Sequence, residues 1–243
     1  ISGSPESPLG SVSLTGTGLS WQDRVEVESL DLSASLSAGQ TIKGDLTATN
    51  VEAVGQTLET LALDLSGTQD DHRLDISAAH REARVLLSFA GALGPEFSTW
   101  AGQLARGEID VTSQDQFWRL NQPADLAYSQ AGRLTFGKHC WMWQDASVCA
   151  GQQTLLPDPS LDYRVRKFPT TALSPLVPET LRWNTLLNAD LSLDSPATGP
   201  EGSLSVNAGS GEFSVLNGDE WETFEYTALS TRLDLLPRQA DLA

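Results

Sequence analysis

The chain of 243 residues is long enough for one large domain or two small ones, and 40% of its residues are hydrophobic, as in a typical folded protein. Its 32 acidic residues outnumber 15 basic ones and give a formal net charge of −17. This excess argues against a nucleic-acid partner, which needs clustered Lys and Arg, and against charge-driven docking on an anionic membrane. The sequence has no run of 18 apolar residues, so we expect no membrane-spanning helix.

Apolar and polar residues alternate along most of the chain, which is typical of strands with one buried face. Turn-forming stretches separate these segments and include SGTQDDH, SAGQT, NQPAD, DSPATGPEG and NAGSGE. The spacing predicts an all-β architecture of about fifteen strands. The alternating segments are residues 25–27, 30–36, 42–48, 61–65, 74–78, 85–89, 109–111, 126–128, 134–136, 161–165, 191–193, 204–206, 213–215 and 229–235.

A flat open sheet rarely holds so many strands, so we expect one long sheet that curls, with apolar residues on its inner face. Short connections favour mostly antiparallel neighbours. One stretch, FPTTALSPLVPETLRW, has apolar residues near helical spacing, and Pro175 and Pro178 limit any helix to about one turn. We therefore expect one short helix near residues 170–177, within a single β-rich segment over residues 1–243 of a longer protein.

The sequence offers no recognisable catalytic or metal-binding motif. His72 and His80 lie in polar turns with no nucleophile motif nearby, so we expect both to be solvated. Neither TQDDH nor NGDEWE carries the further ligands of a calcium loop, and the Asn217-Gly218 pair predicts a tight turn. No phosphate-binding glycine loop, HExxH or CxxC is present. We expect no enzymatic activity, no cofactor and no metal.

The chain's two cysteines, Cys140 and Cys149, lie in the stretch HCWMWQDASVC. A metal site with His139 would lack a fourth ligand at normal spacing, and a pair of free thiols would fit a reducing compartment. A disulfide between two neighbouring strands agrees best with the spacing. It would place the protein in an oxidising compartment such as the periplasm.

Five tryptophans lie near the expected strand ends, where we expect them to seal the rim of the sheet with the indole N–H on solvent or a carbonyl. They are Trp21, Trp100, Trp118, Trp183 and Trp221. Trp141 and Trp143, next to Cys140, are the candidates for an exposed aromatic platform of a sugar-binding or adhesion protein.

Several stretches in this order resemble the middle part of the TamB family, most clearly over about residues 58–206. They are LDLSGTQDDHRLDISA, STWAGQLARGEIDV, FWRLNQPADLAYS, HCWMWQDASVC and VPETLRWNTLLNADLSL. The resemblance implies a periplasmic protein of a Gram-negative bacterium, anchored in the inner membrane and paired with TamA, an outer-membrane barrel protein. It also implies a sheet folded like a taco around an apolar interior, as in AsmA-like proteins thought to carry phospholipid between the two membranes.

Our first functional hypothesis is therefore a segment of an apolar groove for phospholipid acyl chains. The alternating segments supply the expected lining. Each CH₂ group of an acyl chain that this lining buries contributes about 0.8 kcal/mol of binding free energy. The lining residues are Leu63, Leu65, Leu74, Ile76, Val85, Leu87, Phe89, Ile109, Val111, Leu161, Val165, Leu204 and Val206.

Two alternatives remain open. A closed β-sandwich core would give the same alternation. A scaffold could accept strands of outer-membrane protein clients along free sheet edges.

Overall fold

The computed structural model describes residues 2–4, 7–21, 25–37, 41–53, 55–95, 98–196, 199–237 and 239–242. These residues form antiparallel strands joined mostly by short turns, so the all-β prediction is confirmed. The chain divides into two compact units, residues 1–131 and 132–243, which we describe separately. In the described residues, no helix has the length and apolar character needed to cross a membrane.

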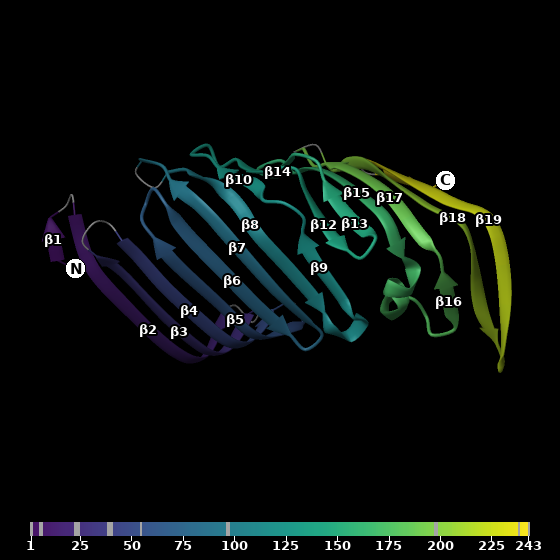
Figure 1. Ribbon diagram of the computed structural model, residues 1–243, viewed down its shortest axis with the longest axis horizontal. Coiled ribbons are helices and arrows are strands. Elements are labelled where there is room, and N and C mark those ends of the chain that lie inside the picture. Colours follow the sequence, from purple (N-terminus) through teal and green to yellow (C-terminus); the bar gives the residue numbers. More distant parts are fainter. Residues whose placement is uncertain are drawn as a thin grey trace. The chain divides into compact units, whose positions relative to one another are not determined.

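In the first unit, each strand from β1 to β8 pairs with the next one along the chain, as the alternating pattern predicts. Figure 1 shows β2 to β8 side by side as long, bent strands. Two short strands then share β8, because β9 pairs with its end and β10 with its beginning. The strands are β1 (Ser2–Ser4), β2 (Ser7–Trp21), β3 (Val25–Ser37), β4 (Thr41–Ala53), β5 (Gln56–Gly67), β6 (His72–His80), β7 (Ala83–Leu93), β8 (Trp100–Val111), β9 (Gln116–Leu120) and β10 (Ala124–Tyr128).

In the second unit, β12 and β13 form a hairpin that continues through β15, β17, β18 and β19. Shorter strands extend this sheet, since β11 pairs with β14, β14 with β15, β16 with β18, and β20 with β19. The strands are β11 (Leu134–Phe136), β12 (His139–Trp143), β13 (Ala146–Ala150), β14 (Gln153–Leu156), β15 (Ser160–Pro169), β16 (Leu181–Asn184), β17 (Leu186–Asp194), β18 (Glu201–Asn217), β19 (Glu220–Leu236) and β20 (Gln239–Leu242).

The expected short helix is present as the 3₁₀ helix η3 (Thr170–Leu176), which contains Pro175. A second 3₁₀ turn, η2 (Thr112–Gln114), was not predicted. The turn predicted at Asn217-Gly218 is confirmed, because it joins β18 to β19. The turn predicted at NAGSGE is wrong. That stretch lies inside β18, where register shifts on either side of Gly209, whose φ is 59°, let the strand continue through a bulge.

Few apolar side chains are fully buried in the described part of the chain. Those that are include Leu104 and Trp118 among several alanines. A closed sandwich would bury the inward side chains of two facing sheets. Most apolar side chains of β3–β7 and of β15, β17 and β18 are instead half-buried, as on a sheet face without a second packed layer.

The disulfide prediction is confirmed, and the metal and free-thiol alternatives for the cysteines are wrong. Cys140 and Cys149 are bonded to each other and lie directly opposite one another in the β12–β13 hairpin, with Cα atoms 4.0 Å apart. The bond therefore closes a short loop and fixes the register of this hairpin.

We expect the Cys140→Ala/Cys149→Ala double variant to lose roughly 2–3 kcal/mol in free energy of unfolding, because the short cross-link restricts the unfolded chain. Urea denaturation of the oxidised protein and of the variant measures the difference. The reduced wild type should match the variant. An unchanged midpoint on reduction would contradict the stabilising role.

Candidate functional site

One face of the first sheet carries apolar side chains in rows that run across the strands. Antiparallel register places each residue of a row directly opposite the next, and such neighbours point to the same face. At about 4.8 Å between strands, a row crossing five strands extends about 19 Å. The central row is Leu32, Leu46, Leu63, Ile76 and Leu87, and a second is Leu65, Leu74, Phe89 and Leu104.

All nine predicted lining residues of this unit lie on that one face. A third row, Leu61, Ala78, Val85, Ile109 and Trp118, adds Val85 and Ile109, and Val111 follows Ile109 at the next inward position of β8. Each of the nine is half-buried. We call this surface, formed by the three rows on β3 to β9, the apolar face of the first unit.

The other four predicted residues share one face of the second sheet. Val165, Ala189 and Val206 form one row, and Tyr163, Leu191 and Leu204 form the next. Leu161 precedes Tyr163 by two residues on β15, so it points to the same face, and it lies opposite Leu193. Each unit thus has its own half-buried apolar face.

The predicted solvation of His72 is wrong, because the side chain is only 7% exposed. Trp100 donates its indole N–H to His72 Nε2 at 2.7 Å, so the other ring nitrogen, Nδ1, donates to the Thr68 carbonyl at 3.1 Å. The indole lies close over Gly91 and Gly102, where an added Cβ would approach it to 2.5 and 2.7 Å. Sequence reasoning missed this pair, although Gly91, opposite His72, and Gly102, opposite Gly91, leave the space for it.

Two more of the tryptophans expected at the rim donate their indole N–H to side chains rather than to solvent or a carbonyl. Trp118 donates to Gln116 Oε1 at 3.1 Å, and Trp183 donates to the Tyr226 hydroxyl at 2.8 Å. Trp141 and Trp143 are half-buried and, by alternation, point away from the face that carries Cys140. They do not form the exposed aromatic platform of the adhesion hypothesis.

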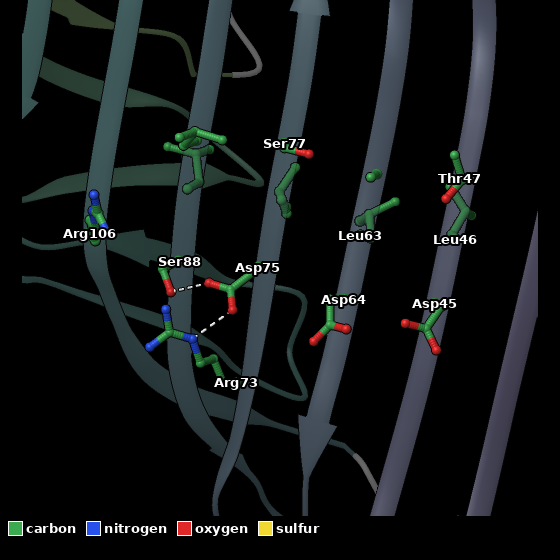
Figure 2. Close-up of a pocket in the computed structure, with 14 residues that line it drawn as sticks. Asp45, Leu46, Thr47, Leu63, Asp64, Arg73, Asp75, Ser77, Ser88 and Arg106 are labelled. Carbon is green, nitrogen blue, oxygen red and sulfur yellow. Dashed lines mark hydrogen bonds and ion pairs between the residues drawn. The ribbon is translucent and has the colours of Figure 1, made fainter.

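The opposite face of the first sheet is polar and has a shallow depression of about 330 Å³. Figure 2 shows Asp45, Asp64 and Asp75 in neighbouring positions on three strands. Like charges directly opposite each other destabilise a sheet. Arg73 offsets part of this repulsion, since its Nε donates to Asp75 Oδ2 at 2.7 Å. That hydrogen bond, assisted by one from Ser88, lowers the pKa of Asp75.

These polar groups do not form a metal centre. Among the residues that the structure describes, no three or more His, Cys, Asp or Glu side chains are grouped to hold a metal ion. The charged groups of the polar depression are therefore paired or solvated. The apolar faces are the surfaces whose apolar side chains remain partly exposed to solvent.

A family model described as TamB, N-terminal domain, matches residues 1–243. The chain belongs to the TamB family. No solved structure matches the chain. The match covers more than the residues that carried the resemblance, and it does not confirm the expected placement in the middle of a TamB protein. TamB membership and the disulfide together fit a protein of the cell envelope with its described part in the periplasm.

We expect Trp100→Phe to lower the free energy of unfolding of this TamB chain by about 1–3 kcal/mol, because it leaves the buried His72 Nε2 without its donor. Chemical denaturation measures the loss. Trp21→Phe is the matched control, since Trp21 is 69% exposed and should change stability by less than about 0.5 kcal/mol. Equal effects would contradict the role of the His72–Trp100 hydrogen bond.

The lowered pKa of Asp75 predicts an acid-dependent loss of stability. The contribution is present above the unfolded-state pKa of about 3.9 and disappears as the pH falls through the lower folded-state pKa. The carboxylate is exposed, so the effect should stay below about 1 kcal/mol and shrink in high salt. Urea midpoints are measured at pH 6 and at acid pH, about 2. The difference between the two midpoints should be smaller in Asp75→Asn than in wild type. In the control Asp64→Asn, which keeps the Arg73–Asp75 pair, the difference should be as in wild type.

Proposed function

We propose that the apolar faces carry phospholipid acyl chains between the inner and outer membranes, by contact alone and without catalysis. The observation that carries the proposal is the set of in-register apolar rows whose side chains are half-buried instead of packed under a second layer. Acyl chains on these rows would remove the remaining apolar surface from water, at about 0.8 kcal/mol per CH₂ group. Because the rows are nearly uniform and aliphatic, no position along them would bind an acyl chain much more tightly than the others.

The charge distribution supports the same proposal. The first unit separates an apolar face from a face with Asp45, Asp64, Asp75 and Arg73, so lipid tails have one compatible side. The inner-membrane anchor and the pairing with TamA belong to this proposal as properties of a whole TamB protein.

Adjacent leucines of β7 provide a matched test. Leu87 lies on the apolar face, whereas Leu86 is 46% exposed on the polar face, opposite Ser77. A photo-crosslinking residue at position 87 of the full-length protein in cells should capture phospholipid, and one at position 86 should not. Mass spectrometry of the captured adducts identifies the lipid.

Leu87→Arg should block lipid transfer, because it places a charge among the apolar rows, while Leu86→Arg leaves transfer intact. Urea midpoints of both variants show whether each remains folded. Equal capture at the two positions, or normal transfer by folded Leu87→Arg, would overturn the proposal. Unfolding of Leu87→Arg alone would instead favour a packed core at this position.

A second candidate is a scaffold that pairs with strands of outer-membrane protein clients. It is favoured by β2, a strand without a charged residue, which pairs with β1 only at residues 7–9 and exposes Val12 and Leu14 by more than half. Such an edge can accept an added strand. Peptide captured from position 12, without lipid at position 87, would make this candidate the leading one.

A further inference from the structure

The apolar face of the first unit ends at a transverse row of polar residues. Glu28 precedes Leu30 by two residues on β3, Asn50 follows Ala48 by two on β4, and Glu59 precedes Leu61 by two on β5. The register aligns them, since Ser29 lies opposite Thr49 and Thr49 opposite Thr60. Thr60 lies opposite Ala79, which places His80 next in this row. We call Glu28, Asn50, Glu59 and His80 the polar row.

Beyond the polar row the apolar residues of β3 and β5 lie on the other face of the sheet. Val27 on β3 and Leu58 on β5 are an odd number of residues from Leu30 and Leu61, so they point to the opposite side of the sheet. Two residues of positive φ, Gly18 on β2 and Asn50 on β4, mark the same line. The apolar face therefore has a polar boundary at this end of its strands.

The charge at the boundary is negative. Glu28 and Glu59 are exposed, and Asn50 donates its side-chain N–H to Glu28. Within the described residues, neither carboxylate forms an ion pair with Lys, Arg or His. Of the described arginines that follow His80 in the sequence, Arg81 pairs with Glu82, and Arg84 lies opposite Ala79, on the other face of the sheet.

We propose that the polar row receives the headgroup of the lipid on the apolar face and favours one that bears an ammonium group, as in phosphatidylethanolamine, over an anionic one. This inference rests on the proposed lipid-carrying function. Carboxylates attract the ammonium of a zwitterionic headgroup and repel a headgroup whose only charge is its phosphate. At exposed positions the preference should be about two- to fivefold and should weaken with salt.

The test uses purified full-length protein with the photo-crosslinking residue at position 87. It is incubated with vesicles of equal phosphatidylethanolamine and phosphatidylglycerol, and captured lipids are quantified by mass spectrometry. Wild type should capture about two- to fivefold more phosphatidylethanolamine. Glu28→Gln/Glu59→Gln should bring the ratio to one without changing the total, and Glu28→Lys/Glu59→Lys should reverse it.

The matched control is Asp45→Asn/Asp64→Asn, which removes the same charge from neighbouring strands on the polar face. It should keep the wild-type ratio. Normal total capture with a ratio of one in wild type, or an equal shift in the control, would overturn the headgroup inference and leave the lipid-carrying function standing. No lipid at position 87 would overturn both.

Discussion

The antiparallel register between long strands is the constraint on which the rest of the structure depends. Side chains alternate between the two faces with a period of two, so a slip of one residue in any strand would move its leucines to the polar side. In the first unit the register holds Leu46, Leu63, Ile76 and Leu87 in line across four strands. Each face therefore keeps one chemical character over many strands, although no strand could establish such a face alone.

A sheet with one apolar face needs something to cover that face. In most β proteins a second sheet does so, and the inner side chains become fully buried. Here the corresponding side chains are half-buried, and among the residues that the structure describes, full burial of large apolar side chains is confined to a few positions such as Leu104 and Trp118. A lipid carrier requires this incomplete burial, because a packed core would leave no surface on which an acyl chain could replace water.

Local interactions stabilise the sheet where alternation by itself would leave it weak. The disulfide between Cys140 and Cys149 fixes a hairpin of five-residue strands on the face opposite Val148 and Val165. The hydrogen bond from Trp100 to His72 connects β8 to β6 across Gly91. The disulfide lies on the face opposite the apolar rows of its unit, and the His72–Trp100 hydrogen bond lies beyond the end of the rows of the first unit, so neither contact interrupts a row.

The sequence by itself determined most of the strands, the identity of the apolar face and the disulfide, because alternation and cysteine spacing are local properties of the chain. It did not indicate β2, β9 or β16. It also indicated the short helix at Thr170–Leu176, where Pro175 and Pro178 restrict the backbone. It gave a false turn at Gly209, since the glycines and polar residues of a bulge resemble those of a turn. It also predicted a solvated His72, which the structure shows to be buried.

Only the tertiary structure decided which residues meet across strands. The burial of His72 depends on Trp100, 28 residues away, and on two glycines of β7 and β8 that leave room for the indole. The polar row of Glu28, Asn50, Glu59 and His80 exists only because the register aligns one polar residue from each of four strands. Alternation specifies the face of each side chain within a strand, whereas its neighbours on that face depend on register, which is a property of pairs of strands.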